Sequence, residues 1–561
     1  MQPDEFAQSI MRAMIKGYGP EFKYNSPGEL LAAAVATPED IARLMEPFPA
    51  RGRYRKSTDF LTQVTSGYAL GRKRYRLFAL RLISLACLME KYQGVHRDKK
   101  IIPGLTPDDE KKLLALGDDI NCDILAEILE SVAEHDTAAY ADAFKILIYC
   151  YLPHLAPYIE AVHFMDTSED NWGNVIGLTL SELVFGHVVS AYIGFCESVL
   201  DYVDRYKNTR IWEIPETEDE NSIFLLPAFT HQQSSTNSTC TKKFVTPVKQ
   251  VVQLLLEMTD GNVFKPFAGK FGGITGNYDS HFAAYPDINW FAHGKEYVES
   301  LGLYYESIVN QSVSFTREAQ HFRTLRTINE QIVKFNLDFR FLVSCPGQFF
   351  VKKLRVGRKG SSSNPGKTNL WMFEGAEMLL RKANALLEFN ATALQGYTQE
   401  GHMGRSVLMR DIGTDFSSIF IALSRMQTEL KGCVPNVEKI RRFIEEYPSL
   451  SMSAMQYVLK RERFQGDAYR EMQSMVMNPD GSYATRAEFM PRFETFLAES
   501  GFSPELCAEL RSCMNPTQLV RPIEKQATAE IITLRNDISR LRQIQGNTPS
   551  LKWYFERQQT I

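Results

Sequence analysis

Apolar residues recur along most of this chain at the three- and four-residue spacing of amphipathic helices. The spacing forms a broad apolar face over residues 67–92, and it continues over residues 118–132 and 140–152. The alternation of apolar and polar residues that indicates β-strands is scarce. The pattern therefore predicts a mostly α-helical protein.

The longest uninterrupted helix pattern follows a short polar segment. Thr167 or Ser168 is a natural N-cap, and the acidic Glu169 and Asp170 suit the positive end of a helix dipole. Residues 172–206 contain no proline, and apolar side chains fill more than one face. Such a helix is about 50 Å long, at about 1.5 Å per residue. A helix this long and apolar has to be buried among partner helices, in a bundle or in an oligomer.

Similar patterns begin at Val248 and at Trp371, and a last one covers residues 527–545. The segment 211–221 is rich in Glu, Asp and Pro and indicates a surface loop. We expect an all-α protein built on a bundle of long helices. Its expected parts are a helical extension (1–45), an N-terminal helical domain (46–166), a central long-helix bundle domain (167–430), a C-terminal helical domain (431–522) and a helical tail (523–561).

Composition narrows the class of protein. The 63 basic and 67 acidic residues nearly balance, which argues against nucleic acid or a membrane surface as a partner of the whole chain. The nine cysteines contain no C-x-x-C pair, as in a cytosolic protein with reduced thiols. We recognise no signal peptide and no uncharged apolar run of the roughly 20 residues that a membrane span needs. The ten histidines form no metal-binding motif. We therefore expect a soluble, cytoplasmic protein without a metal or a cofactor.

Residues 360–370, with the sequence GSSSNPGKTNL, form a small polar loop between two apolar regions. A basic run over residues 352–359 leads into it, and the helix pattern from Trp371 follows. A loop of this kind is either a flexible linker or a catalytic loop.

A phosphate-binding P-loop is a poor match to this segment. Five residues separate Gly360 from Gly366, one more than the P-loop motif has. Pro365 also removes one of the backbone N–H donors on which a phosphate cradle depends. The segment is not predicted to bind phosphate in that way.

The same loop resembles the signature Gly-Ser-Ser-x-x-Pro-x-Lys-x-Asn of the fumarase/aspartase superfamily. The matching residues are Gly360, Ser361, Ser362, Pro365, Lys367 and Asn369. Five further segments follow in the order typical of the adenylosuccinate lyase family, in its longer bacterial-type branch. These segments are residues 51–54, 134–136, 163–170, 230–233 and 276–286. The resemblance covers about residues 46–522.

The resemblance implies a fold, an assembly and a reaction. The fold would have three helical domains, with central helices from four chains joined in one bundle of a homotetramer and each site shared between chains. The reaction would be a β-elimination that releases fumarate from adenylosuccinate, giving AMP, and from the succinyl-carboxamide ribotide of purine biosynthesis. It would need no cofactor.

The resemblance also implies catalytic roles. Ser361 would be the base that removes a proton from the carbon next to a carboxylate, activated when a mobile loop closes. His231 would be the general acid that protonates the leaving nitrogen. Lys367 and Asn369 would stabilise the carboxylate on which charge gathers.

Substrate binding would draw on residues from several segments. Ser406 and Arg410, four residues apart, would share a helix face and could hold a phosphate, although a capping serine and a solvated arginine explain the pair equally well. The predicted binding residues are Arg53, Tyr54, His135, Asp136, Thr167, Ser168, Thr230, Gln233, Gln311, Ser406 and Arg410.

Several positions depart from the family pattern. The turn after His231 lacks a glycine and two prolines, and Gly401 replaces an arginine that helps to bind phosphate, with His402 and Arg405 nearby as substitutes. The signature loop also differs, at Arg358, Asn364, Gly366 and Leu370. Three functions are therefore open: an adenylosuccinate lyase, a lyase of the same mechanism that acts on another succinyl adduct, and a catalytically impaired relative that serves as an interaction platform.

Overall fold

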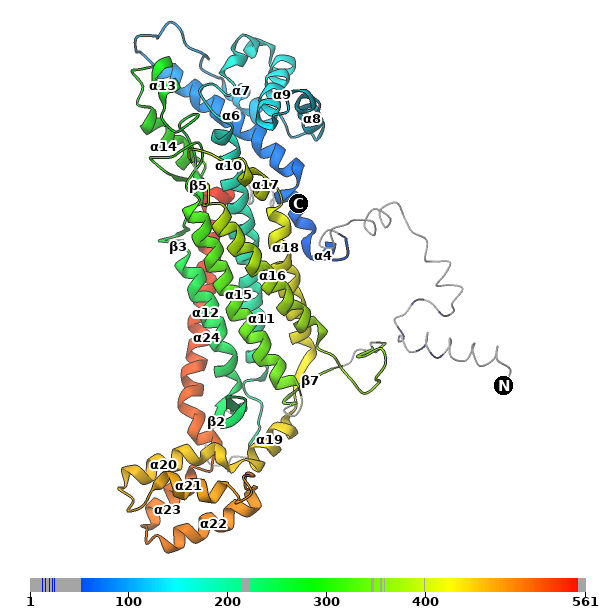
Figure 1. Ribbon diagram of the computed structural model, residues 1–561, viewed down its shortest axis with the longest axis vertical. Helices are drawn as coiled ribbons and strands as arrows, with labels where there is room; N and C mark the ends of the chain where they lie inside the picture. The colour runs from blue at the N-terminus through cyan, green and yellow to red at the C-terminus, as the bar shows by residue number, and fades with distance from the viewer. Residues whose placement is uncertain are drawn as a thin grey trace, which may run out of the picture.

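The computed structural model describes residues 52–212, 222–344, 348–353, 356–357, 359–397 and 399–552, together with five isolated positions before residue 26. It shows a long bundle of helices with a smaller group of helices at each end (Figure 1). The all-α prediction is confirmed. The extension predicted over residues 1–45 lies outside the described residues, apart from those isolated positions, and so do Arg358 and most of the loop predicted over residues 211–221.

The helices at the upper end in Figure 1 come mainly from the first part of the chain. Ser66 caps the longest of them, because its hydroxyl accepts the Ala69 N–H at 3.1 Å. The elements before the bundle are α4 (Arg55–Thr58), η1 (Asp59–Leu61), α5 (Thr62–Thr65), α6 (Gly67–Lys91), α7 (Pro107–Ala115), α8 (Asn121–Ala133), α9 (Asp136–Tyr151) and η2 (Pro153–Ala161). Two later helices, α13 (Asp279–Ala284) and α14 (Trp290–Ser300), return to the same end.

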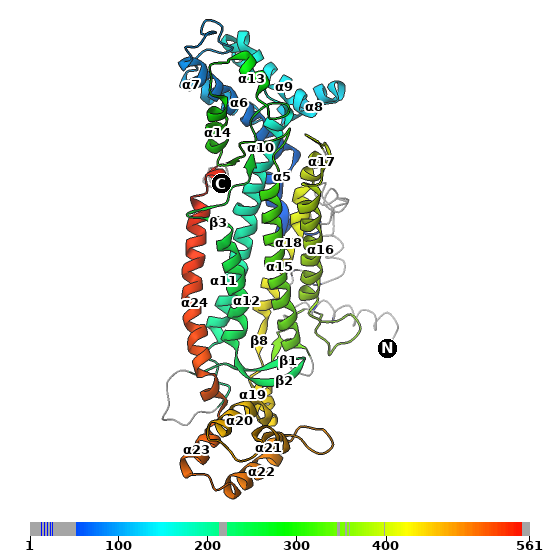
Figure 2. The same cartoon turned by 60° about the vertical axis from the view of Figure 1, so that its left-hand side comes forward.

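Five long helical stretches and the tail helix run the length of the bundle (Figures 1 and 2). The helix pattern predicted to begin at Trp371 is confirmed by α16, which starts at that residue. The bundle elements are α10 (Ser168–Leu180), η3 (Ser181–Val188), α11 (Val189–Tyr206), α12 (Cys240–Glu257), α15 (Thr316–Val343), α16 (Trp371–Ala393), α18 (Ile412–Gly432) and α24 (Pro516–Gly546); the short α17 (Gly404–Arg410) precedes α18.

The central helix is continuous from Ser168 to Tyr206, which confirms the long helix predicted over residues 172–206. Thr167 is its N-cap residue, and its N–H donates to Asp170 Oδ2 at 2.7 Å. By length and composition this helix could cross a membrane, although Glu182 and Glu197 interrupt its uncharged apolar run. However, 67% of its most apolar window is buried within the protein, as in the core helix of a soluble protein.

The middle of this helix, η3, is a π-helical segment. A π-helix carries an extra residue per turn and changes the pattern of backbone hydrogen bonds. The tail helix α24 binds this segment: Gln545 Nε2 donates to the carbonyls of Phe185 at 2.6 Å and Gly186 at 3.0 Å, and to Ser190 Oγ at 2.7 Å. The tail predicted from its apolar pattern therefore packs along the bundle and is bonded to its central helix.

Among the described residues, the strands form four two-stranded pairs. The largest is an antiparallel hairpin, β1 (Leu225–Thr230) and β2 (Gln233–Thr239), in which Thr230 pairs with Gln233 across a two-residue turn. The helix pattern did not reveal this hairpin. The other pairs are β3 (Thr259–Asp260) with β4 (Val263–Phe264), β5 (Ala268–Gly269) in parallel with β6 (Tyr304–Tyr305), and β7 (Phe350–Lys352) with β8 (Cys433–Pro435).

The helices at the lower end have a hydrophobic core of their own, which includes Met455, Met472, Phe489 and Phe493. After them the chain turns back, and α24 runs up the whole bundle (Figure 2). The lower elements are α19 (Val437–Glu446), η4 (Pro448–Ser451), α20 (Met452–Arg461), α21 (Ala468–Val476), α22 (Arg486–Glu499) and α23 (Pro504–Ser512), and the short η5 (Pro549–Leu551) follows α24.

Candidate active site

One group of predicted residues lies at the upper end of the bundle. His135 is the N-cap residue of α9, and its Nε2 lies 3.5 Å from Ser168 Oγ, in the first turn of α10. Arg410, at the end of α17, places Nη2 2.5 Å from Asp136 Oδ2. The fold thus brings together residues that are far apart in the sequence: His135, Asp136, Thr167, Ser168 and Arg410.

Asp136 is held between two arginines. Arg74 Nη2 lies 2.7 Å from the same Oδ2 atom. Arg74 is itself buried, with its guanidinium 4.3 Å from the Trp172 ring centroid and 4.9 Å from that of Tyr140. Burial opposes ionisation of Asp136, but Arg74, the Thr137 N–H and Arg410 outweigh it, so the pKa of Asp136 is lowered. Asp136 therefore acts as a fixed anion that orients two cations.

A cavity of about 310 Å³ opens beside this ion pair. Arg74 and Arg410 supply positive charge to its wall, Glu130 and Asp136 supply negative charge, and Tyr140 and Trp172 supply aromatic surface. A hollow that combines charged groups with flat aromatic rings suits a small polar ligand with a planar group.

Gln311 and Ser406 lie on the same side of the molecule as Arg410. The Gln311 N–H donates to the Glu400 carbonyl at 3.0 Å, and a Cβ atom added to Gly401 would lie 2.0 Å from Gln311 Oε1. Ser406 is buried on α17, and Arg410, one turn later, pairs with Asp136. The arginine of this pair is therefore not simply solvated.

Tyr54 lies against a different part of the bundle. Its hydroxyl accepts a hydrogen bond from Arg425 Nη2 at 2.8 Å, and Arg425 also stacks 5.7 Å from the ring centroid of Trp371, the first residue of α16. Arg53, its neighbour, is exposed. This predicted pair is thus placed near the end of the signature loop and not with the upper group.

Thr230, His231 and Gln233 form the tip of the β1–β2 hairpin, near the lower end of the bundle (Figure 2). All three are exposed. His231 and Gln232 have φ angles of 51° and 61°, so both turn residues are left-handed. A two-residue hairpin turn requires this conformation, which glycine and asparagine adopt more readily. The candidate general acid is thus an exposed residue of a hairpin turn.

Hydrogen bonds between residues that are close in sequence fold the signature loop back on itself. Ser361 Oγ accepts the N–H groups of Asn364 at 3.2 Å and Ser363 at 3.4 Å, and the Asn369 N–H reaches the Gly360 carbonyl at 3.3 Å. Lys367 is exposed. The loop therefore presents a serine oxygen that already accepts hydrogen bonds from backbone donors, and the exposed Lys367 belongs to the same loop.

The base of the loop is anchored by the basic run that precedes it. Lys352 Nζ donates to the Asn369 carbonyl at 3.1 Å and pairs with the buried Glu429. Lys352 is thus a structural cation and does not contribute to an open basic surface. A hollow of about 740 Å³, lined by Phe341, Lys352, Lys367 and Asn369 among others, lies between the loop and the end of α15.

The hairpin and the loop flank the same helix end. Phe229, two residues before His231, has its ring centroid 5.0 Å from that of Phe341, which also lines the hollow beside the loop. The upper group lies at the start of α10, 39 residues of helix away from the end of α11. That helix is about 60 Å long at about 1.5 Å per residue. One chain therefore does not bring His231 to Thr167 and Ser168.

Comparisons with known proteins find similar lyases. A protein-family model described as "Lyase" matches residues 202–384. Adenylosuccinate lyase of Dictyostelium discoideum is 24% identical over 474 residues, covering 82% of this chain and 94% of that protein. Adenylosuccinate lyase of Escherichia coli K12 is 25% identical over 395 residues, covering 70% of this chain and 79% of that protein.

Solved structures share the fold. The β-carboxy-cis,cis-muconate cycloisomerase of Acinetobacter calcoaceticus has a TM-score of 0.59 at 14% identity, covering 85% of this chain and 98% of that one. A fumarate lyase of Mesorhizobium has a TM-score of 0.59 at 11% identity, covering 85% and 97%. By these similarities the chain is a lyase with a fumarase/aspartase-type fold. The matched region of this lyase contains both the hairpin and the signature loop.

The sequence pattern did not single out one buried lysine of the lyase as a site residue. Lys270 follows β5, and its Nζ lies 2.9 Å from Asp170 Oδ1 and 2.7 Å from the Gly273 carbonyl. The Gly273 N–H also donates to Asp170 Oδ2 at 3.2 Å. This ion pair fixes the first turn of α10, which carries Ser168. The signal available was a lysine within the apolar, glycine-rich stretch 267–276, just before a segment that matches the family.

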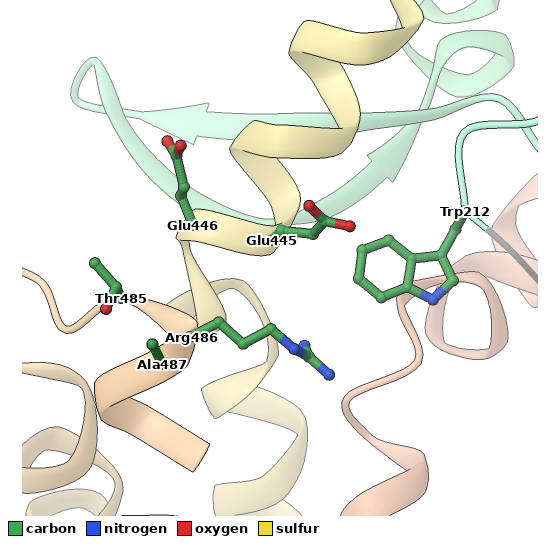
Figure 3. A pocket seen from close by; sticks show the side chains of 6 residues that line it. All are labelled: Trp212, Glu445, Glu446, Thr485, Arg486 and Ala487. Carbon is green, nitrogen blue, oxygen red and sulfur yellow. The ribbon is translucent and has the colours of Figure 1, made fainter. Parts of the chain in front are cut away.

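A further hollow of about 460 Å³ lies at the lower end of the lyase, where Arg486 and Glu445 point toward the Trp212 ring and Glu446 points away (Figure 3). The Arg486 guanidinium is 5.9 Å from the Trp212 ring centroid. None of the predicted site residues lines this hollow. It is therefore separate from the candidate site.

Proposed function

We propose that this lyase is an adenylosuccinate lyase, which releases fumarate from adenylosuccinate to give AMP and from the succinyl-carboxamide ribotide of purine biosynthesis. The observation that carries the proposal is the occurrence of the Ser361 loop, the His231 hairpin and the cation-lined upper group in one chain whose curated relatives in Dictyostelium and E. coli are adenylosuccinate lyases. As a soluble nucleotide enzyme it would act in the cytoplasm.

We propose that Ser361 is the base. A hydroxyl is a weak base, but the N–H groups of Ser363 and Asn364 already point at its oxygen and would stabilise an alkoxide. Lys367, in the same loop, adds a positive charge. The alkoxide would remove a proton from the succinyl carbon next to a carboxylate, and the electron pair would move onto that carboxylate.

Lys367 and the side-chain amide of Asn369 would stabilise the resulting dianion. The electron pair then returns to form the double bond of fumarate as the carbon–nitrogen bond breaks. His231, in its protonated form, would give its proton to the leaving nitrogen. One proton is thus removed from carbon and one is delivered to nitrogen, so the elimination balances.

The upper group would hold the nucleotide. His135, Thr167 and Ser168 offer polar hydrogen-bonding groups, and Arg410 offers a cation that Asp136 orients. Trp172 and Tyr140 provide aromatic surface in the adjoining cavity. Arg53, Tyr54, Thr230, Gln233, Gln311 and Ser406 complete the proposed binding set.

The site needs more than one chain, because its two halves lie at opposite ends of the bundle. We propose a homotetramer in which chains run side by side and each site takes residues from three of them. Large apolar side chains on the outer face of α15 and α16 support such contacts: Leu337 is 41% exposed, Met378 57% and Phe389 54%. Monomers rarely leave adjoining apolar groups of this size in water.

Gly401 favours a second candidate, a lyase of the same mechanism that acts on another succinyl adduct. Position 401 is a glycine whose backbone lies against Gln311, and the family's arginine is therefore absent here. A substrate without the usual phosphate would suit this change.

Fumarate release from adenylosuccinate and from the succinyl-carboxamide ribotide tests the proposal. Wild-type protein is expected to process both substrates. Ser361→Ala and His231→Asn should each lower kcat by at least about a hundredfold. Ser363→Ala, in the same loop, should retain activity. Mixing the Ser361→Ala and His231→Asn proteins, followed by dissociation and reassembly, should restore part of the activity, because mixed sites then contain both groups. No fumarate from either substrate would reject the proposed function, and fumarate from a different succinyl adduct would favour the second candidate.

A further inference from the structure

Arg405 is a buried arginine without a hydrogen-bonded anion. It lies on α17 with 4% of its surface exposed. Within the described part of the chain, its Nε and Nη1 atoms have no hydrogen-bond partner. The two other buried arginines of this end differ, because Arg74 lies 2.7 Å from a carboxylate oxygen of Asp136 and Arg81 lies 3.1 Å from one of Asp166. Arg405 is thus a buried cation, and its hydrogen-bond partner is not a side chain of the described residues.

Two aromatic rings hold the guanidinium in place. Its central carbon is 4.6 Å from the ring centroid of Tyr397 and 5.2 Å from that of Phe315. Rings that stack on a guanidinium contact its faces and leave its N–H groups, which lie in the plane, available to oxygen atoms. These contacts fix the orientation of Arg405 without satisfying its donors.

The surroundings place this cation beside the candidate site. Burial raises the pKa of Glu169, and Arg405 is the main charge that opposes this shift, followed by Lys270. Glu169 adjoins Ser168 in the first turn of α10. Ser406 is the next residue along α17, and Arg410 ends that helix at Asp136. Arg405 therefore lies near the first turn of α10, which carries Ser168.

Position 401 differs from the family resemblance. The family resemblance implies an arginine at this position, but a Cβ on Gly401 would lie only 2.0 Å from Gln311 Oε1. No side chain fits there unless Gln311 moves. The chain instead supplies a guanidinium four residues later, at Arg405.

We propose that Arg405 binds an anionic oxygen group of the substrate, either a phosphate or a carboxylate. The inference deepens the proposed function and rests on it for the identity of the substrate. A guanidinium binds both groups through paired, charge-assisted N–H···O bonds, so the chemistry is shared and the source has to be found by experiment.

The experiment compares wild-type protein with Arg405→Met, which keeps the length and the apolar contacts of the side chain, and with Arg405→Lys, which keeps the charge but not the planar donors. Arg317→Met is the matched control, because Arg317 also stacks on an aromatic ring, that of Tyr304 at 3.5 Å. Affinities for AMP, adenosine, inorganic phosphate and succinate are measured by calorimetry and by ligand-induced shifts of the thermal midpoint.

If Arg405 binds phosphate, Arg405→Met weakens AMP and inorganic phosphate by about 10- to 100-fold and leaves adenosine and succinate unchanged. If it binds a carboxylate, succinate alone weakens. Arg405→Lys should lose part of the affinity in either case, which keeps the test decisive if the methionine variant does not fold. The control should bind as wild type does.

The proposal is overturned if neither anion stabilises the wild-type protein, or if both Arg405 variants bind the four compounds as wild type does. A merely structural arginine would lower the thermal midpoint without anions and leave the anion-dependent shift intact. The proposed function fails separately, when wild-type protein binds an anion through Arg405 but releases no fumarate.

Discussion

Replacing Lys270 with methionine removes the cation of an ion pair that is almost wholly buried. The side chains of Lys270 and Asp170 are 0% and 3% exposed, and Nζ lies 2.9 Å from Oδ1. Breaking such a pair leaves a buried charge uncompensated and costs about 3–5 kcal/mol. Asp170 would keep the N–H groups of Thr167 and Gly273. We therefore expect Lys270→Met to lower the free energy of unfolding by about 3 kcal/mol, the lower end of that range.

Urea denaturation followed by circular dichroism, at one protein concentration, measures this loss. Asp170→Asn in the Lys270→Met background should recover part of it, because the uncompensated charge is then gone. Lys334→Met is the control: Lys334 pairs with Asp338 on the surface, where both side chains are about two-thirds exposed, and an exposed pair is worth less than about 1 kcal/mol. A loss for Lys270→Met no larger than that of the control would refute the reasoning.

Three further predictions concern stability. Burial raises the pKa of Glu318 to about 7, above its unfolded value of about 4.3. The protonated carboxyl thus stabilises the fold, and this contribution falls as pH rises from about 4.3 through 7. Glu318→Gln should therefore remove this part of the pH dependence of the thermal midpoint. A thermal midpoint that changes with pH in the variant as it does in the wild type would contradict the prediction. Gln545→Ala should cost about 1–3 kcal/mol in urea denaturation, whereas the exposed Gln543→Ala should cost almost nothing, and equal losses would count against the bonds to η3. Gln232→Gly should stabilise the hairpin turn by up to about 1 kcal/mol, because Gln232 has a left-handed φ of 61°; a lower thermal midpoint would disprove this.

The spacing of apolar residues was sufficient to predict the long helices, because a core helix has to present apolar residues at a regular spacing. It did not reveal the β1–β2 hairpin: residues 225–229 form a short apolar run, which fits a strand and a buried helix equally well. The π-helical turn at η3 was also invisible, since one extra residue in a turn leaves the apolar pattern of a fully buried helix unchanged.

The candidate site was predictable only through the resemblance. Sequence order places Ser361, His231 and Thr167 in one chain, but it does not tell that Thr167 lies at the opposite end of the bundle from the other two. The burial of Lys270 and Arg405 was harder still to predict, because a buried cation contradicts the apolar pattern around it. Arg405 was noted in the sequence only as a neighbour of Gly401, and its burial between Tyr397 and Phe315 depends on packing that no local pattern encodes.

The bonds from Gln545 to Phe185, Gly186 and Ser190 also bear on the order in which the chain folds during synthesis. The central helix leaves the ribosome long before residue 545 of the 561 has been made. Until then, the carbonyls of Phe185 and Gly186 lack the donor that they have in the finished structure. The nascent bundle therefore has to wait until residue 545 has been translated before its middle is complete, and a chain released before that residue has an unfinished core.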